Sequence, residues 1–553
     1  MADTKFKALL FDTRSIQKYI YSGNLLRTNI GASYIVDRIF FDILTETLKE
    51  IFPKEDFSSA QDTAWDSKQD DLAAWEKMKN CCVAYIGGGN AFVLFNAEIE
   101  DRRREVVKKF TMKLLAEYPG LKVGVAFGDL RLTEGILNQD DINKLYAELK
   151  KNQNTIFPAV NVPYSGLTLS CEINGEAANF CDTKNLVKPI NEIRFYSQET
   201  AVKADFAHDA NKNLKERFNK IFAVKNSSVN MKDFEFPTKV DELGQKEGEN
   251  YFSIIHVDGN NMGVKFRKCE SLVDRRKLSR EIRRKTEGAF GDLILKIIAA
   301  KNGGLFDEIL DLNKNLLPIR PLILGGDDVT FICPANMAIL FTKTLMESLN
   351  ATTPDDSPEQ LKKDAARKMD CCAGVAILPT AYPFFRGYQL AEQLCDAAKA
   401  AMRSEKNSEG SSWLDFAILH GEQAPTLEQI REREYIGARG NLHFGPYKVG
   451  NDKNSRYNIE NLLSCTAQFF KCMAHGKVKE LRGILQRGKD DTDKFLLQLK
   501  HIKQEMPVVE DWKTCITDSL WSKEKSPRTP YVDAIELMDF YSPEVAEKWQ
   551  NLT

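Results

Sequence analysis

One order of sequence patterns occurs twice along the chain, and this repetition constrains the fold more than any single motif. In the second half, the stretch YFSIIHVDGNNMG (residues 251–263) is largely apolar and runs into an acid, Asp258, and a glycine-containing loop. This pattern indicates a β-strand followed by a turn. A long helical stretch, an apolar hairpin and a helical segment come next. A strand at residues 371–379, another helix and a closing strand complete the pattern.

The first half repeats this order. The stretch at residues 5–17 begins with a strand that ends at Asp12, and helical spacing follows over residues 31–52. A second apolar hairpin, CVAYIGGGNAFVLF, precedes another helical stretch and a strand at residues 120–130 that carries the same Gly-Val-Ala. The interval from the acid to the hairpin is 75 residues in the first copy (87 − 12) and 67 in the second (325 − 258). Repeats of this size indicate duplicated domains rather than a solenoid.

The repeated order predicts an α+β protein. Strand–helix–helix–strand–strand–helix–strand describes a ferredoxin-like domain, an antiparallel sheet with helices packed on one face. We expect one such domain over residues 1–165 and another over residues 249–424. Between them, residues 166–248 are irregular and then helical, which predicts a linker domain. Residues 425–553 have mixed charge and helical spacing, which predicts a C-terminal α-helical domain.

Composition excludes several classes of protein. Hydrophobic residues make up 43% and charged residues 28% of the chain, which is typical of globular proteins. No apolar run has membrane-spanning length, and the N-terminal sequence has the features of neither a signal nor a transit peptide. The net charge of −2 means that nucleic-acid binding would need local basic patches. Twelve scattered cysteines without a C-x-x-C motif favour a reduced, cytoplasmic protein with no membrane partner.

The second hairpin, PLILGGDDVTFICP, carries the acids that point to chemistry. Gly325 and Gly326 permit unusual backbone angles and leave room for a ligand. Asp327 and Asp328 repel one another unless a cation lies between them, and Mg²⁺ or Mn²⁺ suits carboxylate oxygens. Asp258 ends the neighbouring strand and supplies a third acid. These three acids are therefore predicted to be the catalytic residues and the ligands of a two-metal site for phosphoryl or nucleotidyl transfer. A solvated turn of favoured turn residues is the alternative.

Other residues are predicted to contact a nucleotide. The loop after Asp258 offers backbone N–H groups to a phosphate. Lys399, in the helix after the second Gly-Val-Ala strand, is placed to contact a triphosphate, with an exposed helical lysine as the equal alternative. The nucleotide-binding residues predicted in the second copy are Gly259, Asn260, Asn261, Gly325, Gly326 and Lys399.

The first hairpin reads Gly-Gly-Gly-Asn and lacks both acids, although Asp12 remains. This degenerate copy is not expected to assemble two metals. Ser33 and Asn90 are predicted nucleotide contacts in it, and a helix N-terminus and a turn residue are the alternatives. The basic stretch DRRKLSREIRRK (residues 274–285) either faces polyphosphate or RNA or, as the favoured alternative, is a solvated charged face.

The strand ending in Asp-Gly-Asn-Asn-Met-Gly, followed by Gly-Gly-Asp-Asp, resembles the palm domains of the large polymerase/cyclase-like subunit of type III CRISPR effector complexes. Residues 28–40, the Gly-Gly-Gly-Asn hairpin and residues 371–401 are also similar to that family. The resemblance covers residues 1–424 and implies two tandem palm domains of the nucleotidyl cyclase/polymerase type, with a C-terminal helical domain. In that family the second palm converts ATP into cyclic oligoadenylate second messengers during antiviral defence.

The resemblance implies a metal-dependent nucleotidyltransferase that uses ATP with Mg²⁺ or Mn²⁺. Two alternatives stay open: a non-catalytic palm scaffold that binds RNA or effector proteins, and a cyclic dinucleotide synthase that uses GTP. Nucleotides are the expected partners, while RNA, other defence subunits and a homodimer are left open. Because the first palm begins at once and the usual cysteine-ligated zinc module is reduced to Cys171 and Cys181, we expect a stand-alone or minimal relative without the nuclease domain.

Overall fold

The computed structural model describes most of the chain, and its description falls into two compact units. The described residues are 4–52, 80–98, 100–133, 136–154, 165–188, 193–351, 369–405, 411–421, 425–450, 455–516 and 520–552. Unit 1 comprises Met1–Asn226, Asn261–Glu287 and Leu322–Asp328, and unit 2 comprises Ser227–Asn260, Gly288–Pro321 and Val329–Thr553. Within the described residues, no helix is both long enough and apolar enough to cross a membrane.

Unit 1 is built on a sheet with the strand order β2-β3-β1-β4-β5. The strands are β1 (Thr4–Arg14), β2 (Cys81–Gly87), β3 (Asn90–Asn96), β4 (Lys122–Thr133) and β5 (Ile136–Leu137). The central strand β1 pairs antiparallel with both β3 and β4, so that Asp12 lies opposite Asn90 on one side and Gly124 on the other. The predicted hairpin and the antiparallel sheet of the first copy are therefore confirmed.

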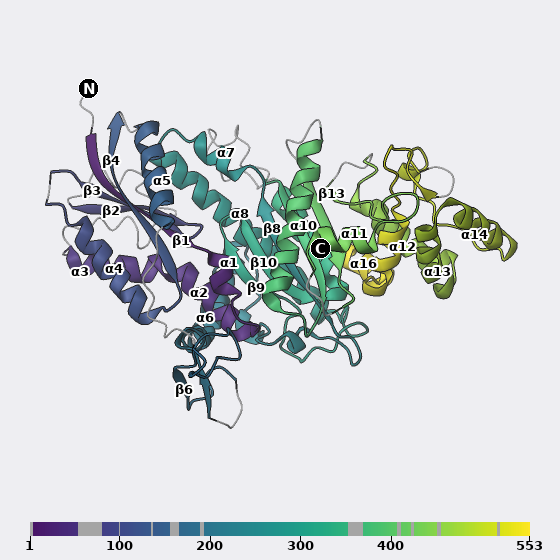
Figure 1. The fold of residues 1–553 in the computed structure, drawn as a ribbon, viewed down its shortest axis with the longest axis horizontal. Helices are drawn as coiled ribbons and strands as arrows, with labels where there is room; N and C mark the ends of the chain where they lie inside the picture. The colour runs from purple at the N-terminus through teal and green to yellow at the C-terminus, as the bar shows by residue number, and fades with distance from the viewer. Residues whose placement is uncertain are drawn as a thin grey trace. The chain divides into compact units, whose positions relative to one another are not determined.

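Helices cover both faces of this first sheet (Figure 1). They are α1 (Ile16–Ile20), α2 (Leu26–Arg38), a π-helical turn (Phe40–Leu44), α3 (Thr45–Ile51), α4 (Arg103–Glu117) and α5 (Gln139–Gln153). On one face Phe11 packs edge-on against Phe110 of α4, with ring centroids 5.2 Å apart. On the other face Leu10 shares a buried cluster with Leu145 of α5. The expectation of helices on one face only was wrong, because β1 carries apolar side chains at successive positions and both of its faces must be buried.

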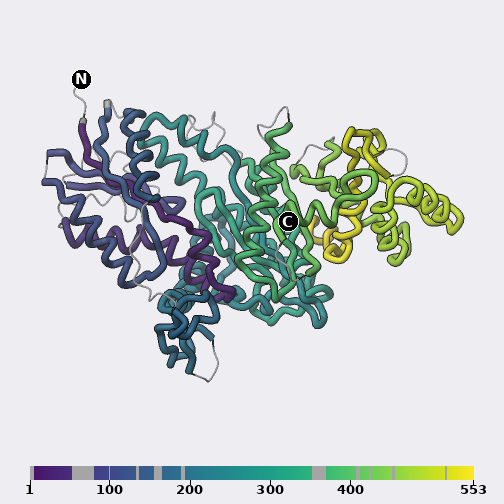
Figure 2. The backbone as a smooth tube through the Cα atoms, viewed as in Figure 1, coloured from purple at the N-terminus to yellow at the C-terminus, as the bar shows by residue number. Residues whose placement is uncertain are grey.

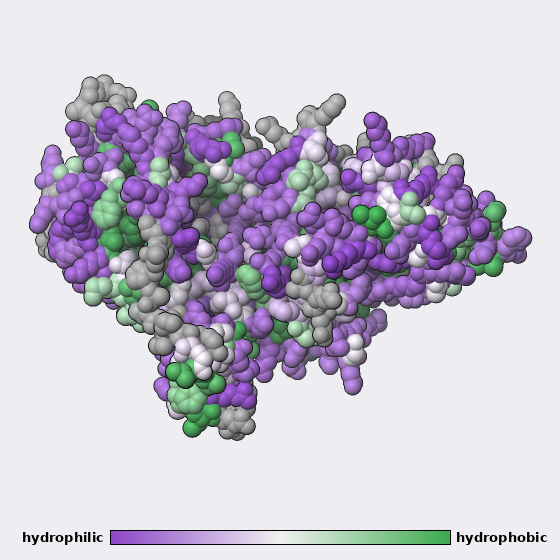
Figure 3. Space-filling view, in the orientation of Figure 1, coloured by the Kyte–Doolittle hydropathy of each residue, from purple (hydrophilic) through white to green (hydrophobic). Residues whose placement is uncertain are grey.

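The segment between the two sheets is irregular and then helical, as predicted. α6 (Gln198–Val224) begins after Ser197, whose hydroxyl accepts the backbone N–H of Thr200. It packs so closely on α2 that a Cβ on Gly31 would lie 1.7 Å from the carbonyl oxygen of Lys203. The strands β6 (Phe180–Asp182) and β7 (Arg194–Tyr196) pair beside it. Apolar residues gather at the surface around β6 (Figure 3), and the most exposed are Leu167, Leu169, Ile193 and Phe195.

Unit 2 is built on a sheet with the strand order β13-β12-β11-β8-β10-β9. The strands are β8 (Tyr251–Gly259), β9 (Arg320–Gly325), β10 (Asp328–Pro334), β11 (Cys371–Pro379), β12 (Ser412–Ile418) and β13 (Tyr447–Val449). β11 pairs antiparallel with β8 and parallel with β12. The sheet is therefore mixed rather than wholly antiparallel, because α10 (Phe384–Ser404) carries the chain back across the sheet between β11 and β12.

The second sheet is also covered on both faces. On one face α10 lies directly on β11, since a Cβ on Gly374 would be 1.9 Å from the carbonyl oxygen of Ala391. On the other face Phe290 of α8 (Leu272–Asn302) packs edge-on against Phe331 of β10, at 5.7 Å between ring centroids. Another helix of the unit is α9 (Ala338–Asn350), while α7 (Met262–Arg267) belongs to unit 1. β8 and β10 are consequently buried strands, which agrees with their nearly continuous apolar sequences.

The C-terminal part of unit 2 is mainly helical, as predicted (Figure 2). Its helices are α11 (Leu427–Glu434), α12 (Ile459–Cys472), α13 (His475–Arg487), α14 (Lys489–His501), α15 (Tyr531–Leu537) and α16 (Pro543–Asn551). β13 also belongs to this part of the sequence, yet it pairs with β12 and extends the second sheet.

A buried ionic cluster ties β12 to α15. His443 Nδ1 lies 2.9 Å from Asp533 Oδ1, and its Nε2 lies 3.1 Å from Asp415 Oδ1. Arg431 also pairs with Asp415, at 3.0 Å. Burial and the charge of Arg431 oppose protonation of His443, but the two carboxylates outweigh them and raise its pKa above the usual value. An imidazolium with an N–H group toward each carboxylate therefore links the sheet to the C-terminal helices.

We expect the Gly31→Ala substitution to destabilise the protein by about 3 kcal/mol, because α2 and α6 must separate to admit the methyl group. The matched control is Gly288→Ala in α8, where a Cβ would meet no atom within 4 Å. That change should be neutral or stabilise by about 0.5–1 kcal/mol through helix propensity. Urea unfolding followed by circular dichroism measures both, and equal effects of the two substitutions would contradict the close packing.

We expect the stability of unit 2 to fall as the pH rises above neutrality. The folded pKa of His443 lies above its unfolded value of about 6.5, so its contribution is complete below that pH and is lost through the folded pKa. Each unit by which the pKa is raised corresponds to about 1.4 kcal/mol. Thermal unfolding between pH 6 and 9 at constant ionic strength should show this slope, and His443→Gln should flatten it. An unchanged slope in that variant would show that other groups cause it.

Candidate functional site

Asp258 stands at the end of a central, buried strand. Its neighbour Gly259 is the last residue of β8, and Asp258 lies opposite Cys372 of β11 in the antiparallel ladder. Cys372 also accepts, at its carbonyl oxygen, a hydrogen bond of 3.3 Å from the Cys395 thiol of α10. The strand is fixed by pairing along its length, so the carboxylate of Asp258 has a well-defined position at the end of the sheet.

Lys399 of α10 lies directly against this carboxylate. Its Nζ is 2.7 Å from Asp258 Oδ2, and the Lys399 side chain is only 19% exposed. Burial alone would lower the pKa of Lys399, but the neighbouring Cys395 sulfur and the hydrogen bond and charge of Asp258 raise it. Since burial raises the pKa of the Cys395 thiol itself and keeps it neutral, Asp258 is the effective counter-charge. Lys399 is therefore not an exposed helical lysine, and that alternative was wrong.

His256 of β8 and Thr330 of β10 also point to this face of the sheet, and sequence reasoning missed both. The His256 ring lies 5.6 Å from the Tyr388 ring of α10, and its Nδ1 lies 3.3 Å from Thr330 Oγ1 of β10. Because side chains alternate along a strand, His256 points to the same face as Asp258. The alternation in the stretch HVD was the signal that could have identified it.

The hairpin between β9 and β10 has the geometry that its glycines suggested. Gly325 ends β9, Gly326 adopts a left-handed φ of 61°, and Asp327 precedes Asp328, the first residue of β10. A Cβ on either glycine would meet no atom within 4 Å. Gly88 of the first hairpin has an almost identical φ of 58°. The glycine side of the turn is thus open, and a ligand can approach the backbone there.

The loop after Asp258 is held by hydrogen bonds of its own. The Asn260 backbone N–H donates to the Asp370 carbonyl at 2.8 Å, and its side-chain amide donates to the Ser411 carbonyl at 3.2 Å. Asn261 adopts a left-handed φ of 58° and starts α7. Asn260 and Asn261 therefore shape the loop, while nucleotide binding by Gly259, Asn260 and Asn261 remains a prediction.

The first copy places an uncharged group where the second copy has Lys399. The Gln153 side chain, at the end of α5, donates a hydrogen bond to Asp12. Burial raises the pKa of Asp12 despite this hydrogen bond. Asn90 donates to the Gly88 carbonyl at 3.1 Å, and the Ser33 hydroxyl donates to the Leu322 carbonyl of β9. Ser33 and Asn90 thus bond to backbone groups, and their contact with a nucleotide also remains a prediction.

The acids predicted to bind metal can be compared with the groups of side chains in the described part of the chain. Among the residues that the structure describes, no three or more His, Cys, Asp or Glu side chains form a group that could hold a metal ion. The carboxylates of Asp258, Asp327 and Asp328 are nevertheless the donors that Mg²⁺ and Mn²⁺ prefer. The Lys399 ammonium at Asp258 also shows that this carboxylate accepts a cation from the α10 face. The metal role of the three acids accordingly remains a prediction.

Comparison with known proteins identifies the second sheet. Residues 251–408 match the family model described as Cas10/Cmr2, second palm domain. No curated protein sequence was found to match the chain.

Two solved structures of similar fold are of Csm1–Csm4 cassettes. A crystal structure of a Csm1–Csm4 cassette in complex with cA4 has a TM-score of 0.51 and 11% identity, covering 97% of this chain and 70% of that chain. A Csm1–Csm4 cassette in complex with pppApA has a TM-score of 0.51 and 12% identity, covering 97% and 69%. At such low identity these structures show similarity of fold alone. Together with the family match at residues 251–408, that similarity confirms the resemblance drawn from the Gly-Gly-Asp-Asp hairpin. Residues 251–408 thus match the second palm domain of the Cas10/Cmr2 family, and the chain has a fold similar to that of the Csm1–Csm4 cassette structures.

Proposed function

We propose that this chain is a metal-dependent nucleotidyltransferase that joins ATP into cyclic oligoadenylates. The observation that carries the proposal is the pairing of Asp258 with a cationic group on the face of the second palm where α10 lies. The similar structures hold cA4 and pppApA, which supports adenine nucleotides as the ligands of this fold. Antiviral signalling is the role that such a product would have here.

The strand register supports convergence of the three acids. β8 and β10 are neighbours in the second sheet, and the side chains of His256 and Thr330 meet across them. In the first palm the equivalent strands are antiparallel, with Asp12 opposite Asn90. If β8 and β10 are also antiparallel and His256 lies opposite Thr330, the residue two positions after His256 lies opposite the residue two positions before Thr330. That register places Asp258 opposite Asp328. Asp327, in the adjoining turn, completes the set.

The proposed chemistry needs no protein nucleophile. The 3′-oxygen of one nucleotide forms a bond to the α-phosphorus of an ATP, the bond from that phosphorus to the bridging oxygen breaks, and pyrophosphate leaves while the hydroxyl proton passes to water. Mg²⁺ or Mn²⁺, held by Asp258, Asp327 and Asp328, would lower the pKa of the hydroxyl and neutralise the leaving pyrophosphate. Lys399 would hold Asp258 in position before binding and then donate to a triphosphate oxygen.

We further propose that the first palm is a catalytically silent partner. Its hairpin lacks both acids, and Asp12 is held by the neutral amide of Gln153 rather than by a cation. The similar structures are two-protein cassettes, so the apolar surface around β6 is a reasonable place for a second subunit to bind. A non-catalytic scaffold would use that surface alone and would turn over no ATP.

We expect Asp327→Asn with Asp328→Asn to abolish oligoadenylate formation, lowering the rate at least a thousandfold, because the remaining acid cannot hold two metals. The purified protein is incubated with ATP and Mg²⁺ or Mn²⁺, and products are identified by mass spectrometry. Parallel reactions with GTP test the alternative of a dinucleotide synthase.

The matched control is Asp12→Asn, which removes the equivalent acid of the first palm and should leave product formation largely intact. Equal product from the hairpin variant and the unmodified protein would refute the assignment of the site. No turnover by the unmodified protein, alone or with a partner subunit, would favour the scaffold.

We expect Lys399→Gln to raise the KM for ATP about tenfold or more, the usual effect of losing a charge-assisted hydrogen bond to a phosphate. The control is Arg403→Gln, an exposed position one turn further along α10. Steady-state kinetics at saturating Mg²⁺ separates KM from kcat. A lower kcat with an unchanged KM would mean that Lys399 only positions Asp258.

A further inference from the structure

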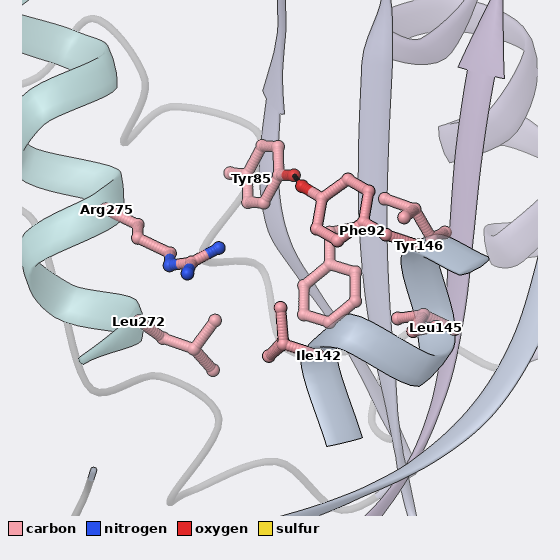
Figure 4. Close-up of a pocket in the computed structure, with 8 residues that line it drawn as sticks. Tyr85, Phe92, Ile142, Leu145, Tyr146, Leu272 and Arg275 are labelled. Atoms are coloured by element: carbon pink, nitrogen blue, oxygen red, sulfur yellow. Dashed lines mark hydrogen bonds between the residues drawn. The ribbon is translucent and has the colours of Figure 1, made fainter. Parts of the chain in front are cut away.

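A small open pocket lies in unit 1, and none of the hairpin acids lines it (Figure 4). Its walls come from the first sheet, from α5 and from the first turn of α8. They are mostly apolar, and the lining residues are Leu10, Tyr85, Phe92, Ile142, Leu145, Tyr146, Leu272 and Arg275. The apolar members continue the buried cluster between the sheet and α5. The pocket is thus a dent in a hydrophobic core, in which a charged residue is unexpected.

Arg275 brings a positive charge into this pocket. Its side chain extends from α8 toward Tyr85 (Figure 4), and the residue is only 9% exposed. Its Nε is buried and, among the described residues, has no hydrogen-bond partner. The carboxylate of the neighbouring Asp274 accepts the Ser271 hydroxyl at 2.6 Å at the start of α8. A buried guanidinium is costly unless an anion or hydrogen-bond acceptor meets it.

Two phenol groups lie at the same pocket. The hydroxyls of Tyr85 and Tyr146 approach one another at 3.4 Å, from β2 and from α5 (Figure 4). Burial raises the pKa of Tyr85 well above its usual value, so its hydroxyl keeps its proton and can donate it. Tyr146 is 44% exposed and opens the pocket toward solvent. A guanidinium and two hydroxyls therefore face a space that a small group can enter.

We propose that this pocket is a binding site for a small oxyanion, a phosphate or carboxylate group, held by Arg275 with hydrogen bonds from Tyr85 and Tyr146. The planar guanidinium matches the two oxygens of such a group, and the low-polarity walls strengthen the interaction. The dent is too small for a whole nucleotide. The oxyanion is thus a free ion or the end of a larger ligand whose remainder lies outside. The site is independent of the proposed nucleotidyl transfer.

This placement also corrects an expectation from the sequence. The basic stretch at residues 274–285 was interpreted in favour of a solvated charged face. Arg275 and Arg276 are 9% and 1% exposed, so that interpretation is wrong for the beginning of α8. Both arginines pack into the core at the start of α8, and the proposed anion in the pocket would balance the charge of Arg275.

Calorimetric titration of the full chain tests the site. Inorganic phosphate and acetate are titrated separately, at an ionic strength held constant with sodium chloride. We expect one equivalent to bind at this pocket, and Arg275→Gln to weaken that binding about tenfold or more. Tyr85→Phe combined with Tyr146→Phe should weaken it several-fold without changing the charge. Phosphate binding alone identifies a phosphoryl ligand, and acetate binding alone identifies a carboxylate.

Two controls separate this pocket from other anion sites. Arg284→Gln removes an exposed arginine of the same helix and should leave the affinity unchanged. Asp327→Asn with Asp328→Asn should also leave it unchanged, so that failure of the proposed catalytic site does not affect the result. If neither anion binds, or if the Arg275 and tyrosine variants bind as tightly as the unmodified protein, the proposal is overturned. Should Arg275→Gln fail to fold, the tyrosine pair decides alone.

Discussion

The close approach of α10 to the second sheet determines where the charges of the candidate site lie. Gly374 has no side chain, so the helix backbone rests directly on β11. Tyr388, Cys395 and Lys399 follow one another along that helix and contact the ends of neighbouring strands. A bulkier residue at the glycine would lift the helix, and the ammonium of Lys399 would leave its carboxylate. The electrostatics of the site therefore rests on a packing contact in which no charged group takes part.

The two palm copies show how one scaffold carries two charge patterns. Each has an acid near the end of a central strand, and each meets that acid with a side chain of the helix that comes after its Gly-Val-Ala strand, α5 in the first copy and α10 in the second. The second copy meets Asp258 with a lysine, whereas the first meets Asp12 with the amide of Gln153. Burial raises the pKa of Asp12, which opposes the ionised form that a metal would require. The divergence is in the partners of the acid and also in the strand register, because Asp12 lies opposite Gly124 whereas Asp258 lies opposite Cys372, two residues before the corresponding Gly374.

The sequence alone was sufficient to predict most strands and hairpins, but it did not predict which elements pack against them. Strand and hairpin periodicity predicted β1, β3, β8 and β10, because buried strands between turn residues have a distinctive pattern. Local sequence does not show which faces become covered. For that reason α5 on the second face of the first sheet and the parallel pairing of β12 were missed. The contact of Lys399 with Asp258 joins residues far apart in sequence, and only packing reveals it. The three acids were singled out because neighbouring carboxylates at a Gly-Gly turn suit a divalent ion, and their role remains a prediction.

The pairing of Lys399 with Asp258 has a consequence for the order of binding. A carboxylate that already has an internal counter-ion is electrically satisfied, and a divalent ion bound there as proposed would have to exchange with that ammonium. The exchange is easiest when a polyphosphate binds at the same time, because its oxygens can accept hydrogen bonds from the displaced Lys399 ammonium. Metal and nucleotide would then depend on one another for occupancy, and free divalent ions alone would be held weakly.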